Sequence, residues 1–183
     1  MTTQILSSNT ISCPLPANLT PLSPNGFNLT INKLPSISFF CQQVNLPSLT
    51  LGVPEQNTPL STIPIPGEML TYDQLQIQFL IDSEMRNYKA IHDWIVGLGF
   101  PENNSQYTQY IEGASIPGIS EVAKSSSDAT LVILGNNNMP IQAIQFADCV
   151  PESLESITFT STNQDVQYLI GSASFRYTYY KFV

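Results

Sequence analysis

The chain has 183 residues, of which 42% are apolar and 11% are charged, and its formal net charge is −8. This length suits one domain with its own core, and the apolar content excludes a chain that is disordered by composition. Only 6 basic residues face 14 acidic ones, which excludes tight wrapping of nucleic acid, because such binding needs clustered Lys and Arg. A surface so poor in charge is weakly protected against association. Coverage by partners and the neutral polar surface of a secreted β-protein both fit this composition.

The chain carries three cysteines, Cys13, Cys41 and Cys149. Their spacing fits neither a zinc site nor a disulfide framework, so we expect reduced thiols, with Cys41 and Cys149 as small core residues. The N-terminal sequence MTTQILSSNTISCPLP has no basic region followed by an apolar one, and we predict no secretory signal. The longest apolar runs are too short to span a bilayer.

Residues 1–26 are rich in Ser, Thr, Asn and Pro, and their four prolines rule out a helix and disfavour a sheet interior. We predict an extended, Pro-rich N-terminal arm there. Two strands follow, at residues 27–31 and 36–43, because apolar and polar side chains alternate in both. The Leu34-Pro35 step between them is typical of a turn, so the two strands are expected to pair as a hairpin.

An extended excursion is predicted next, at about 50–70. The prolines within 54–66 make this stretch unsuitable for an internal strand. We expect a hairpin-like projection with an exposed apolar edge formed by Leu60, Ile63 and Ile65. Excursions of this length from a compact domain are usually functional.

The clearest strand covers residues 75–81, where apolar residues alternate with glutamines. A helix is predicted directly after it, at about 83–98, because apolar residues recur there at steps of three and four. Asp82 or Ser83 is expected to cap its N-terminus, and glycines are expected to end it.

The rest of the chain alternates between strands and connections. We expect a long polar loop at about 100–127, strands at 130–134 and 141–146, a connection at 148–156, a short strand at 157–160 and a closing strand at 166–182. Many strands, one helix and no βαβ repeat indicate a mainly β fold, an antiparallel β-barrel or sandwich with one flanking α-helix. We expect a single domain over 27–183.

Catalytic patterns are weak in this sequence. His92 and Asp93 are adjacent on the predicted helix, where side chains point about 100° apart, so Asp93 is not expected to orient His92. The sequence has no Gly-x-Ser-x-Gly, no His-Glu-x-x-His and no phosphate-binding Gly-rich loop. Glu152 and Glu155 have too few oxygen ligands near them to hold a cation. We therefore predict no enzyme, no metal and no cofactor.

Four segments carry a resemblance to a known family. FNLTINKLPSISFFCQQVNLPSL (27–49) contains two predicted strands, and LTYDQLQIQFLIDSEMRNYKAIHDWIVGL (70–98) contains a strand, an acidic cap and a helix with Asp-Trp. IQAIQFADCVPESLESITFTST (141–162) has a strand followed by Cys-Val-Pro, and VQYLIGSASFRYTYY (166–180) is a closing strand. This order resembles the tail tube proteins of contractile-tailed, T4-like bacteriophages. It resembles equally the baseplate proteins that initiate that tube.

The resemblance implies a β-barrel or sandwich subunit, six copies of which form a ring. Stacked rings would make a channel for genome delivery inside a contractile sheath. The implied partners are further copies of the chain, sheath and baseplate proteins, and DNA that passes without specific binding. The implied location is the virion tail, assembled in the host bacterial cytoplasm. Because no second domain for gripping other baseplate parts is attached, the repeating tube subunit is favoured over the baseplate initiator.

Under this interpretation, Gln76 and Gln78 are expected to face the lumen, with the Ser- and Thr-rich faces of the last strands as an alternative. The residues expected at interfaces between copies are Leu60, Ile63, Ile65, Tyr88 and Trp94. Aromatic residues are favoured interface anchors, but packing of Trp94 inside its own domain is an equal alternative.

Two other classes of function remain open. A glycan- or cell-surface-binding β-sandwich would use exposed tyrosines and a neutral surface, and it would persist as a monomer. A β-barrel hydrolase would require an activity that disappears when His92 is changed. Rings or tubes in the electron microscope would favour the tube protein over both.

Overall fold

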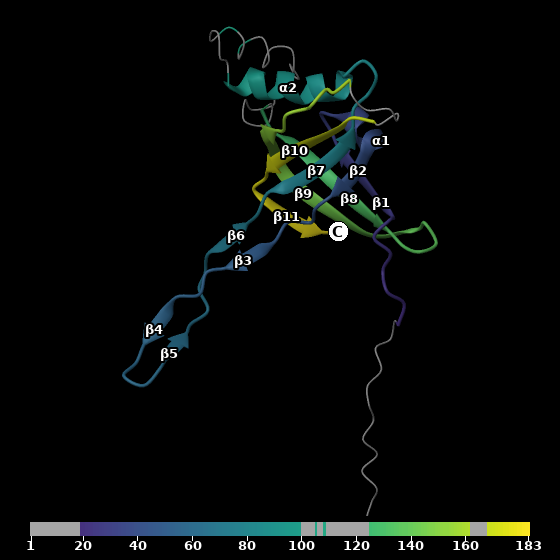
Figure 1. Cartoon of the computed structure of the whole chain (residues 1–183). Coiled ribbons are helices and arrows are strands. Elements are labelled where there is room, and N and C mark those ends of the chain that lie inside the picture. The colour runs from purple at the N-terminus through teal and green to yellow at the C-terminus, as the bar shows by residue number, and fades with distance from the viewer. Residues whose placement is uncertain (1–18, 100–104, 106–107, 109–124, 162–167) are drawn as a thin grey trace, which may run out of the picture.

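The computed structural model describes residues 19–99, 105, 108, 125–161 and 168–183, which form an antiparallel β-sandwich (Figure 1). The elements are β1 Phe27–Ile31, α1 Pro35–Phe40, β2 Cys41–Val44, β3 Leu49–Leu51, β4 Glu55–Asn57, β5 Thr62–Pro64, β6 Leu70–Tyr72, β7 Leu75–Leu80, α2 Arg86–Gly99, β8 Ser127–Leu134, β9 Pro140–Leu154, β10 Ile170–Arg176 and β11 Tyr179–Phe182. The predicted mainly β, antiparallel fold is confirmed, as a sandwich rather than a closed barrel.

Two sheets share the long strand β9. The first sheet has the order β1-β8-β9-β11, and the second has the order β9-β10-β7-β2. The first half of β9 pairs with β8 and β11, and its second half pairs with β10. Asp148, in the middle of β9, has a φ of 55°, and this left-handed residue bends the strand from one sheet into the other.

The core lies between the two sheets and continues under both helices. Burial alternates most clearly in β7, where Leu75, Ile77 and Phe79 are buried and the glutamines between them are exposed. The buried apolar residues are Leu29, Ile31, Leu34, Ile37, Leu75, Ile77, Phe79, Ile91, Trp94, Ala129, Leu131, Ile144, Phe146, Cys149, Ala173 and Phe175. Fully burying each large side chain among them contributes about 1.5–3 kcal/mol to folding.

Helix α2 lies across one end of the sandwich (Figure 1) and buries Ile91 and Trp94. The helix predicted at 83–98 is confirmed, but it begins at Arg86 because Met85 has a φ of 54°. The Asp82 carboxylate accepts a hydrogen bond from the Ser83 amide at 2.8 Å and so shapes a turn before the helix instead of capping it.

The prediction of a hairpin between residues 27–31 and 36–43 is wrong. Strand β1 pairs with β8, and residues 35–40 form the short helix α1 before β2 begins. Pro35 occupies the first turn of that helix, where a missing N–H costs nothing. Ile37 is fully buried beneath it, so a single inward side chain replaces the alternation expected of a strand.

The second half of the chain also differs from prediction. Residues 148–156 are not a connection, because β9 runs through to Leu154, and residues 157–160 are not a strand. The predicted closing strand is divided into β10 and β11, which belong to different sheets. Parts of three predicted elements lie outside the described residues: 1–18 of the N-terminal arm, 100–104, 106–107 and 109–124 of the polar loop, and 166–167 of the closing strand.

Residues 49–72, where the excursion was expected, form a two-stranded projection that we call the hairpin arm. Strand β3 pairs with β6 near the sandwich, and β4 pairs with β5 towards the tip. The hairpin arm leaves the end of the sandwich that lies opposite α2 (Figure 1). None of the helices described is long and apolar enough to cross a membrane.

Candidate functional site

The half of the hairpin arm nearest the sandwich has one apolar and one polar face. Residues that pair directly across an antiparallel ladder share a face. Leu49 pairs with Tyr72 and Leu51 with Leu70, whereas Thr50 pairs with Thr71 on the other side. This part of the arm is therefore an amphipathic ribbon whose apolar side is solvent-exposed.

The outer half of the hairpin arm carries isoleucine on one of its two faces. Ile63 pairs with Gln56, while Asn57 and Thr62 occupy the opposite face. The predicted interface residues Ile63 and Ile65 are 48% and 42% exposed, and Leu60 at the tip is 98% exposed. Their predicted role at an interface stays a prediction, and each is accessible for it.

No second layer among the described residues covers the apolar face of the hairpin arm. Eight of its large apolar side chains are exposed: Leu49, Leu51, Val53, Leu60, Ile63, Ile65, Met69 and Leu70. A two-stranded hairpin alone is marginal in water, and apolar patches above a few hundred Å² are typical of interaction sites. The arm therefore has the character of a surface that another molecule covers.

An aromatic cluster holds the root of the hairpin arm. The ring of Tyr72 lies 5.9 Å from that of Tyr177 and 5.6 Å from that of Tyr180, and Tyr177 also contacts Phe146. The Tyr177 hydroxyl is buried without a hydrogen-bond partner among the described residues. Burial, followed by the neighbouring Tyr180 and by Asp73, raises the pKa of this hydroxyl to about 12. These ring contacts attach the base of the hairpin arm to the core.

The predicted lumen residues Gln76 and Gln78 lie on the outer face of the second sheet. Gln76 pairs with Ser174 and Gln78 with Ser172, so the glutamine row and the serine row, which were predicted as alternatives, form one surface. Ser153 of β9 joins them through a 2.7 Å hydrogen bond between its hydroxyl and that of Ser174. These side chains line a shallow depression of about 150 Å³. At its margin, Arg176 and Glu152 neutralise each other in an ion pair of 2.7 Å.

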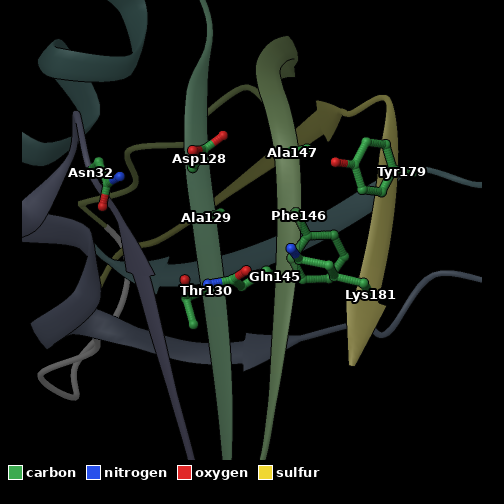
Figure 2. A pocket seen from close by; sticks show the side chains of 9 residues that line it. All are labelled: Asn32, Asp128, Ala129, Thr130, Gln145, Phe146, Ala147, Tyr179 and Lys181. Carbon is green, nitrogen blue, oxygen red and sulfur yellow. The ribbon is translucent and has the colours of Figure 1, made fainter. Parts of the chain in front are cut away.

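The outer face of the first sheet is different, because charged side chains point out from it. Figure 2 shows Asp128 of β8 and Lys181 of β11 around a depression of about 230 Å³, with Tyr179 on the same side. The Asp128 carboxylate accepts a hydrogen bond from the Asp148 amide at 3.2 Å, across the bend in β9. The two outer faces therefore differ in charge as well as in sequence.

The predicted anchor Trp94 is buried inside its own domain, at 3% exposure. Its indole N–H donates a hydrogen bond to the Ser125 carbonyl at 3.0 Å, and Lys33 Nζ lies 5.0 Å from the ring centroid. The alternative in which Trp94 packs within the core therefore describes its position in the single chain. Tyr88 is half-buried and donates a hydrogen bond from its hydroxyl to the Glu155 carbonyl at 3.2 Å.

The strands at the margins of both sheets are paired on one side only within the part of the chain that the structure describes. These strands are β1 and β11 in the first sheet, and β2 and the second half of β9 in the second. Open edges of this kind pair readily with strands of another chain. Neither sheet is thus closed by the described residues of one copy.

Titratable groups do not gather into a larger cluster. His92 Nδ1 lies 3.2 Å from an Asp93 carboxylate oxygen, contrary to the prediction that Asp93 would not orient it, because both exposed side chains bend towards each other. Among the described residues, no group of three His, Cys, Asp or Glu is placed to hold a metal ion. Burial raises the pKa of Cys41 to about 11 and that of Cys149 to about 12.

Comparison with solved structures gives the class of fold. The chain superimposes on a chain of the anti-feeding prophage baseplate with a TM-score of 0.57 and 14% identity, covering 90% of this chain and 96% of that one. It also superimposes on a chain of the tube terminating cap of the same prophage, with a TM-score of 0.56 and 12% identity, covering 95% and 98%. The chain therefore has the same fold as these chains of the baseplate and of the tube terminating cap.

Among curated proteins, the chain is similar to the tail tube terminator protein of Enterobacteria phage T4. The two are 24% identical over 159 residues, which cover 82% of this chain and 80% of the phage protein. No family model matches the chain. The resemblance to the tail tube proteins, predicted from the four sequence segments, is confirmed at this level.

Proposed function

We propose that this chain is a structural, non-catalytic subunit of a contractile phage tail, in which six copies close into a ring of the tail tube. The observation that carries the proposal is the hairpin arm, whose apolar face is covered by none of the residues that the structure describes. A surface of this kind is maintained in a folded protein when a partner buries it. The shared fold with chains of a baseplate and of a tube terminating cap supports an assembly in which such a partner is present.

Ring closure follows from the open sheet edges. A copy on each side would pair with β1, β2 or β11, each of which has one unpaired side in the described residues. Closing a sheet on itself removes edges that otherwise invite aggregation. The low charge of the chain, 11% of residues, reduces repulsion between identical neighbours.

We place the ring at the end of the tube, as a terminator. The similarity to the T4 tail tube terminator over most of both chains supports this position. A repeating tube ring is the second candidate, because the α2 end of the sandwich and the hairpin arm at the other end both carry exposed apolar side chains, such as Phe39 and Leu60. This suits stacking on copies of itself. Sheath and baseplate proteins are the further partners expected of either position.

The outer face of the second sheet is proposed to line the lumen through Gln76 and Gln78. Amide and hydroxyl groups release no counterions from phosphates, so DNA would pass this surface without being held. The net charge of −8 adds repulsion rather than attraction. The charged outer face of the first sheet would then point towards other tail proteins.

The experiment is light scattering combined with negative-stain microscopy of the purified chain. Rings with a central hole support the proposal: single rings indicate the terminator, and stacked tubes indicate the repeating subunit. A persistent monomer would overturn the proposal. If that monomer bound on a glycan array, the glycan-binding β-sandwich would replace it.

A further inference from the structure

The two strands of the hairpin arm differ in length at the middle of the arm. The Gly52 amide donates a hydrogen bond to the Met69 carbonyl, and the Ile65 amide donates one to the Pro54 carbonyl, both at 2.9 Å. One residue separates these positions on the outgoing strand, whereas three residues, 66–68, separate them on the returning strand. The two extra residues form a β-bulge, which bends its strand and increases the local twist of the ribbon.

The ladder of the hairpin arm turns over at this bulge. Near the sandwich β6 lies above β3 in Figure 1, but at the tip β4, which continues β3, lies above β5. The outgoing and returning strands therefore exchange places between the root of the arm and its tip. The side of the ladder that faces the viewer at the root faces away at the tip.

The apolar side chains change from one side of the ladder to the other at the same place. The outgoing strand stays regular through the bulge, because its carbonyls point to the returning strand at every second residue there. Leu51 and Gln56 therefore project from opposite sides of the ladder. Leu70 pairs with Leu51, and Ile63 pairs with Gln56. Because the ladder also turns over between these pairs, the leucines of the root and the isoleucines of the tip face the same way in space.

Gly67 allows the two strands to approach closely at the bulge. Its amide donates a hydrogen bond to the Gly52 carbonyl at 2.9 Å. A Cβ at position 67 would lie 2.2 Å from that carbonyl oxygen and 3.0 Å from Pro54 Cδ, so any other residue forces the strands apart. Gly52 on the opposite strand differs, since a Cβ there would meet the Met69 carbonyl oxygen at 3.5 Å, an ordinary van der Waals distance.

We infer that Gly67 is a positioning residue for assembly, which turns the tip of the hairpin arm so that root and tip present one apolar side to the same partner. The inference rests on the proposed function, in which a partner buries the apolar side chains of the arm. With a side chain at position 67, the strands separate at the bulge and the turn between the two ladders changes. The isoleucines of the tip then point away from the partner, while the leucines of the root keep their contacts.

The test compares Gly67→Ala with its matched control Gly52→Ala, each with and without the pair Ile63→Ser and Ile65→Ser. Light scattering across a concentration series measures assembly. In the unchanged chain and in the control, the serine pair should weaken association on the order of a hundred- to a thousandfold. In the Gly67→Ala background it should weaken association less than about threefold, because the tip no longer contributes. Leu51→Ser should weaken association in both backgrounds, because the root remains in contact.

Urea denaturation of the same variants separates the direction of the tip from loss of folding. Gly67→Ala should leave the urea midpoint unchanged, since the arm lies outside the core; a shift as large as that of a core substitution would overturn the inference. An equal effect of the serine pair in both glycine backgrounds would also overturn it, and so would a Gly67→Ala background in which Leu51→Ser has no effect. These results leave the proposed function standing. If the unchanged chain forms no assembly, the proposed function fails as well.

Discussion

The hairpin arm makes a quantitative prediction about assembly. Replacing Ile63 and Ile65 together by serine removes the apolar side chains from one face of the β4–β5 ladder. These isoleucines are 48% and 42% exposed. About 70–85 Å² of each is thus free for a partner, and the pair contributes on the order of 3–4 kcal/mol per arm at about 25 cal/mol per Å². Association at each arm should weaken on the order of a hundred- to a thousandfold.

The same change should have little effect on the free energy of unfolding of the single chain. Both side chains project into solvent, and substitutions at such positions usually shift the free energy of unfolding by less than about 0.5 kcal/mol. Urea denaturation measures this quantity, while light scattering across a concentration series measures assembly. The matched control is Asn57→Ser with Thr62→Ser, which changes the opposite face of the same ladder.

The isoleucine change should reduce assembly without reducing the free energy of unfolding. The isoleucine variant should lose assembly at concentrations where the control still assembles, with equal stability of the two monomers. Unchanged assembly of the isoleucine variant would refute the role of the arm as the buried surface. A stability loss as large as that of a core substitution would show that the arm already packs against its own domain.

Three further predictions concern the core, the arm root and the proposed lumen. Trp94→Ala should lower the free energy of unfolding by about 3–5 kcal/mol in urea, because the indole fills the space beside Phe175 and holds the Ser125 carbonyl; a loss under about 1 kcal/mol would contradict its core position. Tyr177→Phe should leave stability at pH 7 unchanged or raise it by about 1 kcal/mol, since its buried hydroxyl has no partner in the described residues. The folded-state pKa of Tyr177, about 12, lies above the ordinary tyrosine value of 10.0, so the unchanged chain should lose stability as the pH rises from about 10 to 12, and the phenylalanine variant should lose less; parallel pH profiles would contradict this assignment. Gln76→Lys with Gln78→Lys should leave rings intact but make them retain DNA in a salt-dependent way in fluorescence anisotropy, unlike Gln76→Ser with Gln78→Ser; equal retention by both would place this face outside the lumen.

The predictions that the structure confirms rest on local periodicity. In β7, alternate burial of Leu75, Ile77 and Phe79 follows from a two-residue period, and in α2 the burial of Ile91 and Trp94 follows from the helical period. Signals of this kind require no knowledge of the partner strand. The start of α2 was misplaced because Met85 adopts a φ of 54°, which is uncommon for a residue with a flexible apolar side chain.

The errors arise where distant partners decide the local structure. Alternation in residues 36–43 indicated a strand, yet only Ile37 is buried there, and Phe39 points outwards from a helix. Pro151 indicated a connection, but it lies within β9 and pairs with Phe175, which is possible because proline is tolerated where a strand has an unpaired side. The residues near Pro151 in sequence do not indicate that this part of β9 has an unpaired side.

The candidate surface was predicted in its parts but not as a whole. Gln76 and Gln78 were placed on one face of their strand by alternation alone. The register between β7 and β10 decides that they form one surface with Ser172 and Ser174. These two strands are separated by roughly half the chain. Trp94 was predicted as an interface anchor because it is aromatic. In the structure it contacts Ser125 and Lys33 of its own chain, which are distant from it in sequence.

The prolines of the hairpin arm suggest how its contacts differ from those of the sheets. Pro64 lies within β5, and Pro54 and Pro66 flank the β4–β5 ladder, so several positions along the arm have no backbone N–H to offer. A ribbon built in this way is poorly suited to gain another strand at its edge, and its apolar face is left as the main source of binding energy. The sheet edges at β1, β2 and β11 carry no proline and remain suited to backbone pairing. Under the proposed function, ring closure through edges and docking of the arm through its face are therefore separable. Substitutions on the arm face should remove the second while leaving the first intact.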